Sequence, residues 1–139
     1  MTQDQKILII DDDPDIREAL TIILESQGYQ VTTAKYGVEG LDKVKAEKPR
    51  MVILDLIMPG MGGFAVYKEL KSSNHPEWND IIILILTSLR EESSRAQFEQ
   101  ETGMKMAVDD YIEKPISPSV ILDRVGNLLN NGSKTVSKM

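Results

Sequence analysis

The chain has 139 residues, a formal net charge of −6 and no cysteine. This length is enough for one domain with a sizeable core that needs no disulfides. The lack of cysteine excludes thiol catalysis and Cys-ligated zinc, and the single histidine, His75, excludes a histidine-rich metal site. Because acidic surfaces repel nucleic-acid phosphates, we expect no direct nucleic-acid binding.

The first residues (MTQDQK) lack the basic and apolar regions of a signal peptide. The longest apolar run, Ile81–Leu86, is too short to span a bilayer. We therefore predict a cytoplasmic protein without membrane insertion. We expect one domain over residues 1–130, followed by a polar, disordered tail over residues 131–139 (NGSKTVSKM).

Short apolar runs predict five β-strands along the chain. In chain order they are Lys6–Asp11, Tyr29–Ala34, Met51–Asp55, Ile81–Thr87 and Asp110–Glu113. The third and fourth runs are apolar on both faces, which is typical of parallel strands covered by helices on each side.

Helical patterns separate these runs. In the first, apolar residues recur at spacings of three and four from Ile16 to Leu24, and Asp13 before Pro14 is the expected N-cap. The other expected helices cover Val38–Val44, Phe64–Leu70, Glu91–Glu101 and the region after Ser117-Pro118. The fourth is the weakest pattern, and the structure of residues 90–108 is left open. Strict alternation of strands and helices predicts an α/β fold with a parallel sheet.

Polar residues collect where the predicted strands end, which is where open parallel sheets hold their functional sites. These residues are Asp11, Asp12 and Asp13 after the first strand, Asp55 after the third, Thr87 at the end of the fourth and Lys114 after the fifth. We expect the first and third strands to be neighbours about 4.8 Å apart, so that their terminal carboxylates can share one ion.

Strand-end acids are often only solvated turn residues or helix caps, and we assign that role to Asp13 because Pro14 follows it. Asp11, Asp12 and Asp55 together would repel one another unless a cation neutralised them. Mg²⁺ suits such a site, because it combines a few carboxylates with waters and phosphate oxygens.

The hydroxyl and the ammonium at this edge suit phosphoryl oxygens as partners. Lys114 can pair with the carboxylates at rest and with a phosphoryl group once it arrives. Thr87 can donate a hydrogen bond to the same group. The sequence does not distinguish whether the Tyr111 side chain is a fixed part of the core or an aromatic ring that moves.

Four segments, ILIIDDDPDIR, VILDLIMPGMGGF, LILTS and DDYIEKPIS, resemble in order and spacing the receiver domains of bacterial response regulators, the chemotaxis-type family. The resemblance extends from Lys6 to about Leu129. It implies a flavodoxin-like, doubly wound (βα)5 fold whose five-stranded parallel sheet has the order 2-1-3-4-5. It also implies a stand-alone response regulator of a two-component or phosphorelay system.

By this resemblance Asp55 is the phosphoacceptor. Asp11 and Asp12 are the acidic pair that holds Mg²⁺, together with Asp55 and the backbone carbonyl of Ile57. The implied phosphodonor is a sensor histidine kinase or a phosphotransfer protein. The protein is then not an enzyme with turnover of its own but a phosphoacceptor that docks an unidentified downstream protein, and a homodimer is compatible with the family.

The resemblance assigns the switch to Thr87 and Tyr111, and it assigns the binding of phosphoryl oxygens to Lys114, whose bond to Pro115 is expected to be cis. The segment between Thr87 and Tyr111 is longer than in most receivers, which leaves the fourth helix and its surface open.

Three other functions compete with this interpretation. A phosphatase with an aspartyl nucleophile would carry a second acid at the position of Ile57. A flavodoxin-type binder would not place three aspartates in its phosphate loop. A phosphorylation-independent pseudo-receiver or interaction module stays open as the alternative, although pseudo-receivers usually lack the acids or the lysine.

Overall fold

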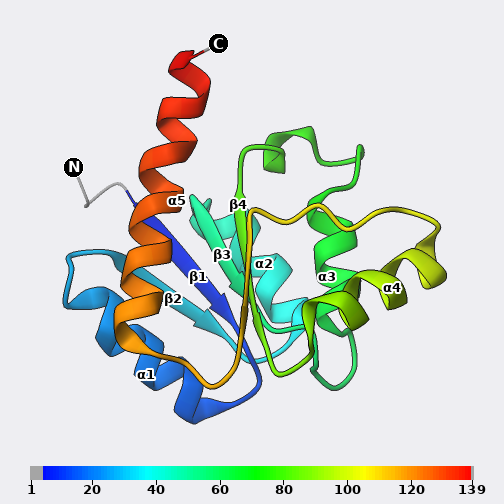
Figure 1. Cartoon of the computed structure of the whole chain (residues 1–139), viewed down its shortest axis with the longest axis horizontal. Helices are drawn as coiled ribbons and strands as arrows, with labels where there is room; N and C mark the ends of the chain where they lie inside the picture. The colour runs from blue at the N-terminus through cyan, green and yellow to red at the C-terminus, as the bar shows by residue number, and fades with distance from the viewer. Residues whose placement is uncertain (1–4, 139) are drawn as a thin grey trace.

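The structure, a computed structural model, describes residues 5–138, with side chains through Asn130. Its strands are β1 (Lys6–Ile10), β2 (Gln30–Ala34), β3 (Met51–Leu54), β4 (Ile82–Thr87) and β5 (Asp110–Glu113). They form one parallel sheet of order β2-β1-β3-β4-β5 (Figure 1). This arrangement confirms the predicted doubly wound order, and each strand lies within one residue of its predicted bounds.

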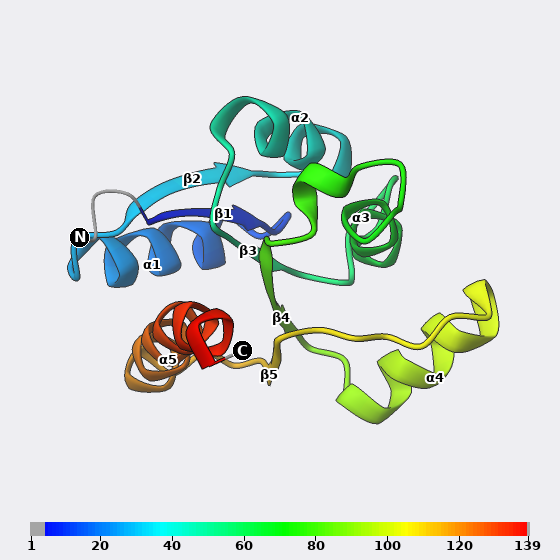
Figure 2. The same ribbon diagram turned by 90° about the horizontal axis from the view of Figure 1, so that it is seen from above.

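The helices alternate with the strands. They are α1 (Pro14–Glu25), α2 (Gly37–Glu47), α3 (Gly63–Leu70), α4 (Glu91–Thr102) and α5 (Pro118–Lys138), with a short 3₁₀ helix, η2 (Pro76–Trp78), before β4. Seen from above, α1 and α5 lie on one side of the sheet and α2 and α3 on the other (Figure 2). The predicted tail over residues 131–139 falls where side chains are not described, so this boundary stays a prediction.

Two apolar clusters, one on each face of the sheet, form the core. Side chains of a strand point alternately to the two faces. In β4, Ile83 and Ile85 therefore join the cluster under α2, α3 and α4, whereas Leu84 and Leu86 join the cluster under α1 and α5. All four side chains are buried. Each such side chain contributes about 1.5–3 kcal/mol through burial, which explains why this run is apolar on both faces.

The cap that the sequence predicted for α1 is present. The Asp13 side chain accepts a hydrogen bond from the backbone N–H of Asp15 at 2.9 Å, and Pro14 occupies the first turn. The stripe of apolar residues in this helix buries Leu20 and Leu24 against the sheet. Asp13 thus serves the helix, as the sequence interpretation proposed.

The loop before β4 is anchored by an aromatic side chain. Trp78 is only 6% exposed and belongs to the core cluster under α2 and α3. The His75 ring stacks on it with a centroid distance of 4.0 Å. Trp78 is therefore a packing residue of this loop.

The weak pattern of α4 has a simple structural reason. Only two of its residues, Ser94 and Phe98, are buried, and they lie one helical turn apart. The Phe98 ring contacts Tyr67 edge to face at 5.2 Å and stacks on Phe64 at 6.2 Å. One serine and one aromatic ring thus replace the usual apolar stripe. Among the residues described, no helix combines the length and apolar character that a membrane crossing requires.

Candidate functional site

Three carboxylates meet at the carboxyl edge of the sheet. Ile10 and Leu54 are partners in the register of β1 and β3, so the residues that follow them, Asp11 and Asp55, emerge side by side. Asp11 and Asp55 are buried, and Asp12 is exposed. Carboxylate oxygens of the three residues lie within 4.8 Å of one another. The structure thus brings together the acids that the sequence analysis singled out.

A single lysine bridges the two buried carboxylates. The Lys114 Nζ atom lies 3.0 Å from Asp11 Oδ2 and 3.2 Å from Asp55 Oδ2. Its backbone N–H donates to the carbonyl of Thr87 at 2.7 Å, which ties the end of β5 to the end of β4. The Lys114–Pro115 peptide bond is cis, as the resemblance implied.

Backbone amides hold the remaining carboxylate oxygens. The N–H of Ile57 donates to Asp55 Oδ1 at 3.1 Å, and the N–H of Asp13 donates to Asp11 Oδ1 at 2.9 Å. Each buried carboxylate therefore has one oxygen on a backbone amide and the other on Lys114. This arrangement fixes the orientation of both carboxylates.

A glycine lets α3 begin directly against the acceptor loop. A Cβ atom on Gly63 would lie 2.1 Å from the Asp55 carbonyl oxygen and 2.4 Å from Leu56 Cα, far inside van der Waals contact. The chain turns back toward this contact at Gly60, whose φ of +70° suits glycine. The loop after Asp55 thus has its shape because glycine is present at both positions.

Burial and charge set the proton affinities at this edge. Burial raises the pKa of the Asp11 carboxyl above its usual 3.8, and the negative charge of Asp55 raises it further. The N–H of Asp13 and the Lys114 ammonium act in the opposite direction but do not reverse the effect. Burial lowers the pKa of Lys114, but its hydrogen bonds and charge interactions with Asp11 and Asp55 outweigh burial, so that its pKa is raised.

This donor set fits a hard divalent cation. It consists of carboxylate oxygens, which Mg²⁺ and Mn²⁺ prefer over nitrogen or sulfur ligands. The exposed Asp12 carboxylate gives the site an approach from solvent. A cation bound there would supply a positive charge that offsets the repulsion between Asp11 and Asp55. The acidic triad is thus suited to a metal.

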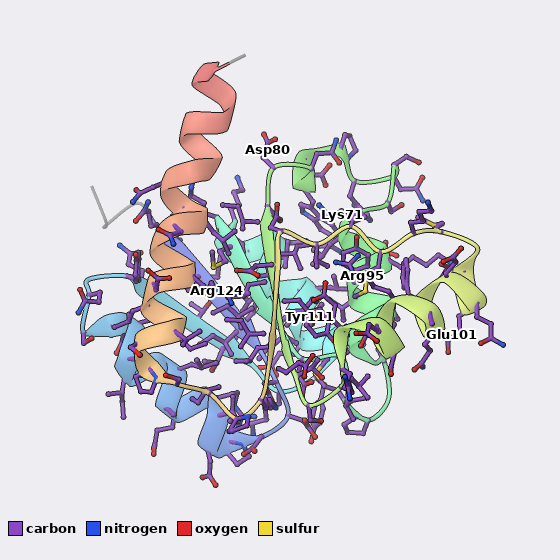
Figure 3. The ribbon with its side chains drawn as sticks, in the orientation of Figure 1. Lys71, Asp80, Arg95, Glu101, Tyr111 and Arg124 are labelled. Atoms are coloured by element: carbon purple, nitrogen blue, oxygen red, sulfur yellow. The ribbon has the colours of Figure 1, made fainter. Side chains whose placement is uncertain are left out.

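The two expected switch residues are buried beside this edge. Thr87 is the last residue of β4 and is fully buried, and among the described residues its hydroxyl has no hydrogen-bond partner. Tyr111 is 9% exposed, and burial raises the pKa of its phenol. The Tyr111 hydroxyl donates to the backbone carbonyl of Leu89 at 3.0 Å. Figure 3 shows Tyr111 near the centre of the molecule, between the sheet and α4.

Two residues near the site were not predicted from the sequence. The Arg17 Nη1 atom donates to the Asp11 carbonyl at 2.9 Å and so fastens the turn that carries the acids. The fully buried Ser94 hydroxyl lies 2.5 Å from the Tyr111 hydroxyl. The only sequence signals for these two contacts were the position of Arg17 in the first turns of α1 and the position of Ser94 one turn before Phe98.

Comparison with known proteins decides the family. A family profile for the response regulator receiver domain matches residues 7–126. The chain belongs to the response regulator receiver family. Receivers are phosphoacceptors of two-component systems rather than classical enzymes. The acidic triad beside Lys114 gives this member the residues of a phosphorylatable receiver.

The relatives share sequence and fold. The chain is 38% identical over 135 residues to a probable transcriptional regulator, ycf27, of Porphyridium aerugineum, covering 97% of this chain and 52% of the relative. It therefore spans about half the length of that protein.

Two solved structures match over nearly their whole length. A response regulator of Chloroflexus aurantiacus, described as putative, has a TM-score of 0.78 and 30% identity, covering 92% of this chain and 99% of that one. The response regulator TrrA of Thermotoga maritima, in complex with Mg²⁺ and BeF, has a TM-score of 0.73 and 31% identity, covering 89% and 98%.

Proposed function

We propose that this chain is a phosphorylation switch in which Asp55 accepts a phosphoryl group beside a bound Mg²⁺. The observation that carries the proposal is the triad of carboxylates within 4.8 Å, bridged by the Lys114 ammonium. Asp11, Asp12, Asp55 and the backbone carbonyl of Ile57 would hold the Mg²⁺. When bound, the cation supplies positive charge that lets an anionic donor approach an anionic acceptor. The Mg²⁺–BeF complex of TrrA supports this assignment.

The proposed donor is a phosphohistidine on a sensor histidine kinase or a phosphotransfer protein. One Asp55 carboxylate oxygen forms a bond to phosphorus while the bond from phosphorus to the imidazole nitrogen breaks. The electron pair of the broken bond stays on that nitrogen, and the imidazole takes up one proton from solvent, so the donor leaves as a neutral histidine. The product is an acyl phosphate on Asp55, the kind of covalent intermediate that carboxylate nucleophiles form.

Lys114 and Thr87 are the proposed partners of the transferred oxygens. The Lys114 ammonium already lies 3.2 Å from Asp55 Oδ2, and it can exchange this contact for a phosphoryl oxygen. The Thr87 hydroxyl is buried and has no partner in the described part of the chain, so a phosphoryl oxygen would satisfy it. Thr87 and Tyr111 would then change position on phosphorylation and alter the surface that docks a downstream protein. We propose that this takes place in the cytoplasm and that the domain itself does not contact nucleic acid.

The acceptor is tested with acetyl phosphate and Mg²⁺. Intact-mass spectrometry should show one added phosphoryl group on the wild type and none on Asp55→Asn, because the amide lacks the nucleophilic carboxylate. Asp42→Asn, which removes an exposed acid on α2, serves as the matched control and should be phosphorylated like the wild type. An Asp55→Asn variant phosphorylated to a similar yield would move the acceptor elsewhere and overturn the proposal.

A further inference from the structure

Helix α4 is attached to β5 by one buried hydroxyl pair. The Ser94 Oγ atom lies 2.5 Å from the Tyr111 phenol oxygen, and the Ser94 side chain is fully buried. The phenol proton is donated to the Leu89 carbonyl at 3.0 Å. Because a phenol has only one proton, Ser94 is the donor in the pair and Tyr111 the acceptor. The two bonds together hold the Tyr111 ring in the core.

Two side chains of α4 are buried, and Ser94 is the polar one. The other is Phe98, whose ring packs against Phe64 and Tyr67 on the side of α3. Ser94 lies on the side of β5, and α4 exposes most of its remaining residues. A buried polar side chain costs free energy unless it is hydrogen-bonded, so the Ser94–Tyr111 bond is what makes a serine acceptable there.

The same strand leads back to the acidic edge. Tyr111 is the register partner of Ile85, and Thr87 lies two residues further along β4 on the same face. Lys114 follows three residues after Tyr111, donates through its backbone to Thr87, and through its side chain contacts Asp55. The position of Tyr111 is thus linked to both groups that would bind a phosphoryl oxygen.

We propose that Ser94 is a positioning residue of this switch: it holds Tyr111 in the core, in the arrangement that leaves the Thr87 hydroxyl free for a phosphoryl oxygen. The inference rests on the proposed function and adds to it the residue that connects the site to α4. If Tyr111 turned outward, both of its hydrogen bonds would break. Removing one of them weakens the inward state, and with it the affinity for any ligand that selects that state.

Beryllium fluoride with saturating Mg²⁺ is the probe, because it mimics a phosphoryl group on a carboxylate. Calorimetric titration should show that Ser94→Ala binds it about five-fold more weakly than the wild type, the factor that one average hydrogen bond represents. Ser93→Ala removes an exposed hydroxyl from the same turn of α4 and should bind like the wild type. Ser94→Cys, with a weaker donor of similar size, should lie between the two.

A double-mutant cycle separates this role from a general loss of stability. Tyr111→Phe lacks the phenol, so adding Ser94→Ala to it should cause no further loss of affinity. In protein labelled at its tyrosines, the NMR signal of the Tyr111 ring in free Ser94→Ala should move toward that of an exposed tyrosine, and the probe should reverse this change. A merely structural serine would leave that signal in place.

The outcomes are distinct. Equal affinity of the wild type, Ser94→Ala and Ser94→Cys, with an unchanged Tyr111 signal, would overturn the role of Ser94 while leaving the proposed function intact. A wild type that binds no beryllium fluoride with Mg²⁺ would overturn the proposed function and this inference together.

Discussion

Three consecutive aspartates after β1 have three different environments. Asp11 is buried and paired with Lys114, Asp12 is exposed beside it, and Asp13 caps α1. Without the family resemblance, the sequence distinguished only Asp13, because Pro14 follows it. The separate positions of Asp11 and Asp12 depend on the turn that Arg17 fastens through the Asp11 carbonyl, a contact that no local pattern indicates.

This difference predicts opposite effects of two neighbouring substitutions. Asp12→Ala should weaken Mg²⁺ binding and slow phosphorylation by acetyl phosphate while changing the free energy of unfolding little, because its side chain is exposed. Asp13→Ala should keep Mg²⁺ affinity and lose about 1 kcal/mol of stability, because the N-cap bond to Asp15 is lost. Calorimetric Mg²⁺ titration and urea unfolding measure the two effects. The reverse result would show that the acidic pair is Asp11 and Asp13.

Single residues should also affect the lifetime of the proposed acyl phosphate on Asp55. Hydrolysis requires a water in line with the phosphorus, and Ile57, two residues after the acceptor, has an apolar side chain that is 49% exposed. Such a side chain cannot orient a water and helps to exclude it. Leu89, the apolar residue two positions after Thr87, packs against the core cluster, so a substitution there would also disturb the core, and Ile57 is the position to change.

We expect Ile57→Asn to shorten the half-life of the phosphorylated protein several-fold, because the amide can bind and orient a water. The measurement is the decay of purified phosphoprotein in excess Mg²⁺ without kinase. Ile22→Asn replaces a similarly exposed isoleucine on α1 and should decay like the wild type. If Ile57→Asn decayed no faster, water access would be controlled by another group.

At the scale of elements, the clearest predictions came from apolar residues. The strands are marked by apolar runs and α1 by an apolar stripe, and their predicted bounds agree with the structure. α4 also agrees with its predicted range within one residue, but it has no apolar stripe, because its only buried side chains are Ser94 and Phe98. Its existence was predicted only weakly, and its attachment through Ser94 to Tyr111 could not be predicted, because a hydrogen bond between distant residues leaves no periodic signal.

The whole molecule brings the candidate site together through its topology. Parallel strands place their carboxyl ends at one edge, so the alternation of strands and helices was enough to predict that Asp11, Asp55, Thr87 and Lys114 meet there. The path from β4 back to β5 was not predictable. Residues 103–109 have no regular structure. They are held by the Tyr67 phenol, which donates to the Ala107 carbonyl and accepts from its N–H, both at 2.7 Å.

This long-range contact predicts how stability depends on pH. Burial raises the pKa of the Tyr67 phenol above its usual 10.0, against the smaller opposing effect of its hydrogen bond with Ala107. Below pH 10 the phenol is protonated in both states and its contribution is complete. Above pH 10 the unfolded chain loses this proton first, so the free energy of unfolding falls until the pH passes the pKa of the folded state.

Tyr67→Phe removes this titration. At pH 7 the variant should be less stable by about 1 kcal/mol, because the bonds to Ala107 are lost and the exposed Ala107 backbone turns to water. Above pH 10 its free energy of unfolding should fall less steeply than that of the wild type, so the difference between the two narrows. Tyr36→Phe, which changes a half-exposed ring, should follow the wild type throughout. Urea unfolding at a series of pH values measures this, and parallel curves for the wild type and Tyr67→Phe would show that the Tyr67 phenol does not ionise differently in the folded and unfolded chains.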